Sequence, residues 1–234
     1  MKVLLGIINC HSRADFQQCV RDTWLPSVPE GLDYRFFLGR GTRQREPKQD
    51  EVFLDCDDTY EGLPEKVQAM FRWALRNGYE FAVKLDDDTV LRPVEWLNTS
   101  GFQYADFIGP RNSGSRPGGV QTPYGFFYCL SREAMKFIID APLPGLSNND
   151  ELWVSQVLHQ NGIFLRHDPR YYLSMGTKEV TLKGARPLRR DIPPPKEPVS
   201  NTFAWCVYLN WEGFHLTPSS EVIKEMKRIH EQTR

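Results

Sequence analysis

The hydrophobic residues of this chain change their spacing repeatedly along the sequence, between every second residue and every third or fourth. The first spacing is typical of β-strands and the second of amphipathic helices, so the chain is predicted to alternate strands with helices. Such alternation folds into an α/β architecture built around a central sheet. With 234 residues, 40% of them hydrophobic, the chain is long enough to bury one core, and we expect a single domain.

Strands are expected where short apolar runs are bounded by glycine, proline or polar residues. These runs cover residues 3–9, 34–38, 51–54, 81–85, 105–108, 126–130 and 163–166. Residues 167–204 break the pattern, because a basic stretch leads into three consecutive prolines at 193–195. Neither a regular helix nor a central strand accommodates such a run, so we expect a long surface excursion there.

Helices are predicted between the strands. The first follows Ser12, which with Asp15 resembles a capping box. The clearest has Pro64 in its first turn and ends at Asn77-Gly78. The remaining helices are expected to begin after Ser131, at Asp150 and at Thr217-Pro218.

The charge and cysteine content exclude several classes of protein. The 29 Lys and Arg nearly balance the 30 Asp and Glu, so binding to nucleic acid through overall charge is not expected. No apolar stretch approaches the roughly 20 residues of a membrane span, and the first run is too short for a secretory signal. A lipoprotein signal ending at Cys10 is disfavoured by the polar Asn9 before it. Five cysteines without C-x-x-C spacing favour free thiols, and we expect a cytoplasmic protein.

Three consecutive carboxylates follow directly on the apolar run at 81–85. If the extended backbone continues through them, Asp86 and Asp88 project to the same side. Two carboxylates that face one point call for a cation, and Mg²⁺ or Mn²⁺ prefers such oxygen ligands. A cation of this kind completes its coordination with water or phosphate oxygens, which indicates a nucleoside diphosphate ligand. The alternative is a solvated turn whose Asp side chains cap the following segment.

A second acidic string permits a different enzyme class. Residues 52–59 contain D-x-D-x-T after an apolar strand, as in phosphatases of the haloacid dehalogenase type. In that interpretation Asp55 is the nucleophile and Asp57 the acid/base. The string usually follows the first strand of that fold, whereas two strands and a helix are predicted before it here.

Five separated segments carry a more specific pattern. They are Arg13 with V-R-D-T-W at 20–24, D-C-D-D-T-Y-E-G-L-P-E-K at 55–66, K-L-D-D-D-T-V at 84–90, D-E-L-W-V-S at 150–155 and F-H-L-T-P at 214–218. Together they resemble the β-1,3-galactosyltransferase family, which includes Fringe and the mucin-core galactosyltransferases. Order and spacing match across most of residues 3–165 and 205–230, while 167–204 are not covered.

The resemblance implies a GT-A fold, with a nucleotide-binding half at about 1–90 and an acceptor half at about 91–234. It also implies a UDP-sugar donor, Mn²⁺ (or Mg²⁺) and transfer with inversion. Its site residues follow from the matching positions. The metal would be held by Asp86, Asp88 and His215, and the nucleotide would be contacted by Arg13, Arg21, Asp86 and Asp87. Arg21 has the alternative of pairing with a structural carboxylate such as Asp55.

The catalytic base is placed by the 150–155 segment. The best register puts Glu151 at the family's catalytic Asp, with Asp150 in the preceding acidic position. Both are expected in the first turn of a helix, where the dipole favours the ionised form that a base requires. The alternative is the ordinary acidity of a helix N-terminus.

The chain departs from the family pattern at Gly125-Phe-Phe-Tyr-Cys-Leu-Ser131, where the family has a glycine-rich G-G-G-Y-V-L-S. Phe126 and Phe127 are expected to fill space that glycines leave for the sugar. Trp153 has two interpretations, stacking on a sugar ring or packing in the core.

The sequence therefore predicts a metal-dependent inverting hexosyltransferase. Galactose is the first donor sugar and N-acetylglucosamine the second, and the acceptor is a glycan or another hydroxyl. A module that binds sugar without turnover is the remaining alternative to the phosphatase.

Overall fold

The computed structural model describes residues 1–40, 45–112, 117–145, 147, 149–175, 204–208 and 219–233. These residues form a seven-stranded sheet in the order β3-β2-β1-β4-β7-β6-β8. The strands are β1 (Val3–Ile8), β2 (Leu32–Gly39), β3 (Glu51–Leu54), β4 (Phe81–Asp86), β6 (Phe107–Gly109), β7 (Phe127–Ser131) and β8 (Arg166–His167). The first four strands in this order are parallel, whereas β7 is antiparallel to both of its neighbours.

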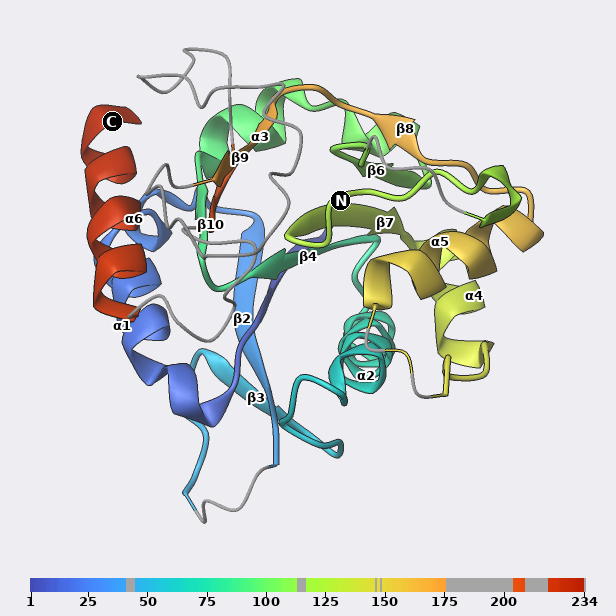
Figure 1. The fold of residues 1–234 in the computed structure, drawn as a ribbon, viewed down its shortest axis with the longest axis horizontal. Helices are drawn as coiled ribbons and strands as arrows, with labels where there is room; N and C mark the ends of the chain where they lie inside the picture. The colour runs from blue at the N-terminus through green and yellow to red at the C-terminus, as the bar shows by residue number, and fades with distance from the viewer. Residues whose placement is uncertain are drawn as a thin grey trace, which may run out of the picture.

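Helices cover both faces of the sheet (Figure 1). On one face lie α1 (Ala14–Asp22) and α6 (Ser219–Thr233), and on the other α2 (Leu63–Arg76), α4 (Arg132–Asp140) and α5 (Asp150–Gln160). Alternate strand residues supply the two cores. In β1, for example, Leu5 and Ile7 belong to the core under α1 and α6, whereas Leu4 and Ile8 belong to the core under α2, α4 and α5. The predicted α/β class is therefore confirmed.

A smaller three-stranded sheet joins β5 (Thr89–Leu91), β10 (Ala204–Tyr208) and β9 (Tyr171–Met175) in that order. Strand β5 follows β4 after two intervening residues, and α3 (Pro93–Thr99) follows β5. The sequence pattern did not predict β5 or α3. The expectation of an irregular excursion at 167–204 is wrong for His167 in β8, for residues 171–175 in β9 and for Ala204 in β10, and residues 176–203 lie outside the described residues.

The predicted helices and turns agree closely with the structure. Strand β3 and helix α5 have the predicted bounds, and the Ser131 side chain caps α4 by accepting from the backbone N–H of Ala134. Gly78 ends α2 with a positive φ of 78°, which glycine adopts without strain. The capping box at Ser12 is wrong: α1 begins after a 3₁₀ turn over residues 11–13, and no side chain caps it.

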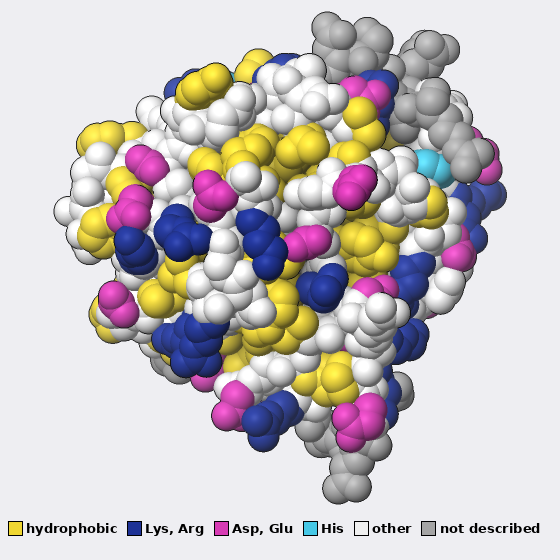
Figure 2. Space-filling model, turned by 180° about the vertical axis from the view of Figure 1, so that it is seen from behind, with side chains coloured by type: hydrophobic (Ala, Val, Ile, Leu, Met, Phe, Trp, Pro, Cys, Tyr) yellow, Lys and Arg dark blue, Asp and Glu magenta, His cyan; other side chains and the backbone are white. Residues whose placement is uncertain are grey.

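Charge and cysteine placement agree with the composition. Figure 2 shows Lys and Arg side chains interspersed with Asp and Glu on one face of the molecule. Among the described side chains, Cys10, Cys19, Cys56 and Cys129 are free thiols, and Cys19 and Cys129 are buried. In the described part of the chain, no helix has the length and hydrophobicity needed to cross a bilayer.

Candidate active site

The three consecutive aspartates lie where β4 leaves the centre of the sheet. The strand ends at Asp86, and the next two residues form a turn before β5. The extended backbone therefore does not continue through the triplet. As a result, Asp86 and Asp87 have different hydrogen-bond partners.

Asp87 is a buried carboxylate that forms an ion pair with Arg13. Together with Asn9, these residues form a group that we call the Arg13 cluster. The Arg13 Nε donates to both carboxylate oxygens of Asp87, at 3.0 and 2.9 Å, and the Asn9 side-chain amide donates to the same carboxylate. Burial would lower the pKa of Arg13, but the charge and hydrogen bonds of Asp87, together with the charge of Asp88, outweigh it and raise that pKa above its ordinary value. Asp87 is 4% exposed, and its oxygens accept from Arg13 and Asn9. Its predicted contact with a nucleotide stays a prediction.

Asp88, in the turn after β4, lies close to Arg13, in the 3₁₀ turn before α1. The Asp88 carboxylate is 3.6 Å from the Arg13 Nη2, and its side chain remains partly exposed. The Arg13 guanidinium also covers the ring of Phe16, at 3.7 Å from the ring centroid. Arg13 and Asp88, both predicted site residues, are therefore brought together at the carboxyl ends of β1 and β4. In parallel α/β sheets this edge is where ligands bind.

Asp86 belongs to a second group, which we call the Lys84 cluster: Lys84, Asp86, Tyr128, Asp150 and Glu151. The Lys84 Nζ donates to the Asp86 Oδ1 at 2.6 Å and lies 3.7 Å from the Asp150 Oδ2. The Tyr128 hydroxyl donates to the same Asp150 oxygen at 2.8 Å. The predicted metal ligand Asp86 and Asp150, the first residue of the predicted acidic pair, therefore share one buried ammonium group.

Glu151 is the more accessible carboxylate of the pair in α5. Asp150 is 1% exposed, whereas Glu151 is only partly buried. The Glu151 carboxylate lies against the backbone of Gly125, where an added Cβ would be 3.1 Å from its Oε2. Burial, followed by the charge of Asp150, raises the pKa of Glu151 to about 7. A carboxylate of this kind can accept a proton near neutral pH.

Helix α5 begins where it does because of its own capping residue. The Asn149 side chain accepts from the backbone N–H of Leu152 at 2.7 Å and so caps the helix. Asp150 and Glu151 thus occupy its first turn, as predicted. Because both the cap and the Tyr128–Asp150 hydrogen bond fix this end of the helix, Glu151 is presented from a defined position.

Arg21 does not join either cluster. Its Nε and Nη2 donate to the Asp50 carboxylate at 2.8 and 2.9 Å, and Glu51 lies 3.5 Å away. The alternative of a structural partner is therefore the one seen, although the partner is Asp50 rather than Asp55. Gln17 connects Arg21 to the Arg13 cluster, by accepting from Arg21 at 3.3 Å and donating to Asn9 at 2.7 Å.

The 55–66 segment supports the walls of the site. Asp58 accepts from the backbone N–H groups of His11 and Gly39, both at 2.7 Å, and from the Lys66 Nζ at 2.8 Å. Lys66 also donates to the carbonyl of Asn9 at 3.0 Å. Asp58 and Lys66 thus fasten the carboxyl ends of β1 and β2 to α2.

The phosphatase interpretation finds no support in this geometry. The Asp55 side chain is 83% exposed, lies at the end of the edge strand β3 and pairs with Arg40 at 3.2 Å. A nucleophile of that class needs a site around it, and Asp55 lies at the surface.

The aromatic residues near the site lie in the core. Phe126 and Phe127 are buried under the α1 and α6 face, where Phe127 contacts the edge of Trp96. Both side chains thus belong to the core, and their effect on the space for the sugar stays a prediction. At Gly125 the group that lies close to the glycine backbone is the Glu151 carboxylate. Trp153 is 5% exposed, and its indole N–H donates to the Pro142 carbonyl, so it packs in the core.

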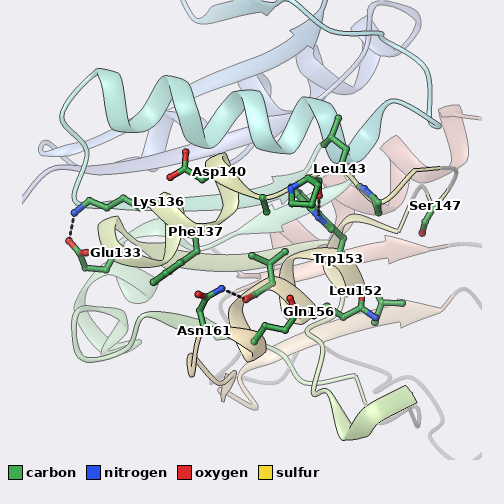
Figure 3. Close-up of a pocket in the computed structure, with 15 residues that line it drawn as sticks. Glu133, Lys136, Phe137, Asp140, Leu143, Ser147, Leu152, Trp153, Gln156 and Asn161 are labelled. Carbon is green, nitrogen blue, oxygen red and sulfur yellow. Dashed lines mark hydrogen bonds and ion pairs between the residues drawn. The ribbon is translucent and has the colours of Figure 1, made fainter.

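A surface pocket of about 830 Å³ lies between α4, α5 and the chain that joins them (Figure 3). Phe137, Leu152 and Trp153 contribute apolar surface to it, with Gln156 and Asn161 among its polar lining residues. None of the residues of the Arg13 or Lys84 cluster lines this pocket. It is therefore distinct from the candidate active site.

The chemistry of the carboxylates fits part of a divalent cation site. Asp86 and Asp88 offer the oxygen ligands that Mg²⁺ and Mn²⁺ prefer. Among the residues that the structure describes, no group of three or more His, Cys, Asp or Glu side chains is arranged to hold a metal. The third predicted ligand, His215, lies outside those residues. The cation site with Asp86, Asp88 and His215 therefore stays a prediction.

Three residues of these clusters have no role predicted from the sequence: Asn9, Lys84 and Tyr128. Each is a polar residue in or directly after an otherwise apolar strand, and each is buried with partners in the site. A polar side chain in the middle of a buried strand was the signal that could have identified Lys84 and Tyr128, because such a group must find a buried partner.

The fold and the site together define an α/β protein of the GT-A type, with carboxylates gathered at the carboxyl end of its central parallel strands. Two solved glycosyltransferases share the fold over nearly the whole chain. One is "a glycosyltransferase involved in the glycosylation of the major capsid of PBCV-1", with TM-score 0.53, 10% identity, and coverage of 97% of this chain and 100% of that one. The other is an active-site mutant of LgtC, with TM-score 0.50, 11% identity, and coverage of 95% and 94%.

Two curated plant proteins resemble the chain in sequence. Probable beta-1,3-galactosyltransferase 13 of Arabidopsis thaliana is 33% identical over an alignment of 109 residues, which covers 38% of this chain and 32% of that protein. Probable beta-1,3-galactosyltransferase 12 of the same plant is 32% identical over 108 residues, covering 38% and 29%. The match spans about a third of the length of these relatives, and no family model matches the chain. The predicted resemblance to β-1,3-galactosyltransferases is thereby confirmed for the aligned part.

Proposed function

We propose that this protein is a metal-dependent inverting glycosyltransferase, which moves a hexose from a UDP-sugar to an acceptor hydroxyl. The observation that carries the proposal is the position of Glu151. It is a partly accessible carboxylate with a pKa of about 7, and Lys84 lies between its neighbour Asp150 and the donor-side carboxylate Asp86. The fold shared with glycosyltransferases and the aligned β-1,3-galactosyltransferases support the same class.

The proposed reaction needs one proton acceptor and one leaving group. The acceptor hydroxyl oxygen forms a bond to the anomeric carbon on the face opposite to the diphosphate, while the bond from that carbon to the diphosphate oxygen breaks. The bonding electrons leave with UDP, and the hydroxyl proton passes to Glu151. Attack from the opposite face inverts the configuration of the sugar. Asp150 is too deeply buried to meet an acceptor, so we assign the base to Glu151 rather than to Asp150.

The donor side is proposed to consist of residues from the first half of the chain, about 1–90. Asp86 and Asp88 would hold the cation together with His215, and Arg13 would face the nucleotide. A divalent cation, when bound there, supplies positive charge that stabilises the departing diphosphate. Residues from about 91 onward, including Glu151, would then form the acceptor side. The names of the relatives favour galactose as the sugar, with N-acetylglucosamine as the second candidate.

The test is a screen for UDP release across several nucleotide sugars, with and without Mn²⁺, using water and simple sugars as acceptors. We expect Mn²⁺-dependent release from one donor, and we expect Asp88→Ala to abolish it while circular dichroism shows an intact fold. The control is Asp55→Ala, which removes an exposed carboxylate and is expected to leave release unchanged.

Each alternative predicts a different result. Unchanged activity of Asp88→Ala would refute the proposed site. Release of phosphate that depends on Asp55 would favour the phosphatase. Binding of a nucleotide sugar without transfer or hydrolysis in the presence of Mn²⁺ would favour a sugar-binding module.

A further inference from the structure

Lys84 is a charged residue in the middle of the central sheet. It lies in β4, opposite Gly6 of β1 and Tyr128 of β7, and it is 1% exposed. A buried ammonium group is costly unless it is paired, so its partners must account for its presence. Although burial lowers the pKa of Lys84, the charges of Asp150 and Asp86 outweigh it and keep the side chain ionised.

The ammonium group contacts three separate segments of the chain. It donates to the Asp86 Oδ1 at 2.6 Å, at the end of β4, and to the carbonyl of Gly125 at 2.5 Å, just before β7. Its third neighbour is the Asp150 Oδ2 at 3.7 Å, in the first turn of α5. Two of these contacts are hydrogen bonds, and the third is an ion pair.

Two of these segments support Glu151. Gly125 provides the backbone against which the Glu151 carboxylate lies, and Asp150 is its neighbour in the helix. The third segment carries Asp86, on the donor side of the proposed reaction. One ammonium group thus contacts the supports of the proposed base and the proposed donor-side carboxylate.

We propose that Lys84 is a positioning residue, which holds Asp86 and the first turn of α5 in the relative arrangement that transfer requires. This inference rests on the proposed function, because the two sides it connects are defined by that reaction. Lys84 touches neither substrate nor the reacting atoms in this role. It acts through Asp86, Gly125 and Asp150.

Lys66 provides a matched control. Like Lys84, Lys66 is buried, at 3% exposed, and it donates hydrogen bonds to one carboxylate and one backbone carbonyl, at 2.8 and 3.0 Å. Its partners are Asp58 and Asn9, so it fastens strand ends without touching the Lys84 cluster. A loss that reflects only a missing buried ion pair should therefore appear equally in Lys66→Met and Lys84→Met.

The first experiment measures kcat, donor KM and the pH profile of kcat for Lys84→Met, Lys84→Arg and Lys66→Met. Asp150, Lys84 and Asp86 face Glu151, and Tyr60 is close enough to sense its charge. Removal of the Lys84 charge leaves the carboxylates unopposed, so the acid limb of the profile should move up by about one pH unit. We expect kcat of Lys84→Met to fall about 100-fold, since small displacements of reacting groups have effects of that size. The acid limb should keep its position in Lys84→Arg and in Lys66→Met.

A second measurement does not require turnover. The Glu151 carboxyl signal in ¹³C-labelled protein, assigned with Glu151→Gln, is titrated in wild type and in Lys84→Met. If wild type transfers no sugar, the proposed function fails, and this titration alone still shows whether Lys84 controls the state of Glu151. A titration that Lys84→Met leaves unchanged, or a kcat within about threefold of wild type, overturns the inference. The inference is also overturned if Lys66→Met loses as much kcat as Lys84→Met and the acid limb of the pH profile moves in neither variant.

The variant Lys84→Met leaves the buried Asp150 and the partly exposed Asp86 without their cation and risks not folding. The double variant Lys84→Met with Asp150→Asn removes the cation and one carboxylate together, and it is then compared with Asp150→Asn alone. A kcat about 100-fold below that of Asp150→Asn supports the positioning role. Equal values for the two overturn it.

Discussion

The two ion clusters at the end of β4 are built from neighbouring residues, yet they differ in their balance of charge. In the Arg13 cluster one guanidinium faces two carboxylates, those of Asp87 and, at 3.6 Å, Asp88, and Asn9 adds a neutral amide. In the Lys84 cluster one ammonium group interacts with three carboxylates, those of Asp86, Asp150 and Glu151. The adjacent residues Asp86 and Asp87 thus belong to different clusters, and the Lys84 cluster has the larger excess of negative charge.

This difference separates a supporting role from a chemical one. A carboxylate that accepts several hydrogen bonds from a guanidinium is held in one position, as Asp87 is by Arg13. A carboxylate that is buried beside further negative charge binds a proton more readily, as Glu151 does: burial first, and then the charge of Asp150, raise its pKa to about 7. Sites that need a base or a cation are built with such an excess. We therefore expect substitution of Asp87 to affect mainly stability, and substitutions in the Lys84 cluster to affect mainly turnover.

The largest expected effect follows from Glu151→Gln, which removes the proposed base with little change in size. We expect kcat to fall by about 10²–10⁴-fold, the usual contribution of a general base. The donor KM should change little, because Glu151 lies on the acceptor side. The measurement is steady-state release of UDP with the donor found in the screen.

The matched control is Glu133→Gln, the same change at the corresponding position of another helix. Glu133 and Glu151 both lie in the first turn of their helices, but Glu133 is exposed and pairs with Lys136. Its kcat should stay within about twofold of wild type. A comparable loss in both variants would mean that acidity at a helix N-terminus, rather than the Lys84 cluster, explains the effect.

A stability effect of the next size is expected for Asp87→Asn. The substitution leaves Arg13 with Asp88 at 3.6 Å as its remaining charge partner. Breaking a fully buried pair costs about 3–5 kcal/mol, but the Arg13 side chain is 38% exposed, so we expect a loss of about 1–3 kcal/mol. Urea denaturation measures it.

Asp86→Asn sharpens this comparison at the neighbouring position. Lys84 keeps Asp150 as its carboxylate partner, and the excess of negative charge decreases, so the free energy of unfolding should change less than in Asp87→Asn. Its activity should fall more. If Asp86→Asn were the less stable variant and Asp87→Asn the less active one, the assignment of roles to the two clusters would be reversed.

The Lys84 cluster also predicts how the stability of the protein depends on pH. Burial and the charge of Asp150 raise the pKa of Glu151 in the folded protein from 4.5 to about 7. The folded state then binds this proton more tightly than the unfolded state. Proton binding at Glu151 therefore contributes fully to the free energy of unfolding below pH 4.5, and this contribution is lost as the pH rises through 7. Glu151→Gln should therefore be more stable than wild type by about 1–3 kcal/mol at about pH 8, with little difference at about pH 4.5.

Thermal unfolding of both proteins across this range is the measurement. A stability gain for Glu151→Gln that did not vary with pH would show that the ionised carboxylate is not the cause. Kinetics give an independent check, because kcat of wild type should rise with pH about an apparent pKa near 7.

The sequence was most informative where one local signal decides the structure. The bounds of β3 and α5, the cap at Ser131 and the stop at Gly78 all follow from residues within a few positions. The acidic pair of α5 was also placed correctly in its first turn. The capping box at Ser12 failed because the chain forms a 3₁₀ turn at residues 11–13 before α1 begins.

What the sequence did not predict depends on contacts between distant segments. Whether Asp87 faces a ligand is decided by Arg13 and Asn9, which lie 74 and 78 positions away. The role of Lys84 likewise depends on Gly125 and Asp150, which the antiparallel pairing of β4 with β7 brings close. No periodicity or motif within one segment encodes such partners.

The smallest predicted effect concerns Tyr128→Phe, which removes the hydroxyl that donates to Asp150 at 2.8 Å. Loss of one hydrogen bond to a charged group should lower the free energy of unfolding by about 1–2 kcal/mol. Tyr79→Phe is the matched control, because its hydroxyl donates to Asp33 at the same distance, outside both clusters. The two variants should lose similar stability, measured by urea denaturation. Only Tyr128→Phe should also lower kcat, because only Asp150 adjoins the proposed base. Equal activity of the two variants would show that Tyr128 has only a structural role in the sheet. The functional part of the Lys84 cluster would then consist of Lys84 and its carboxylates alone.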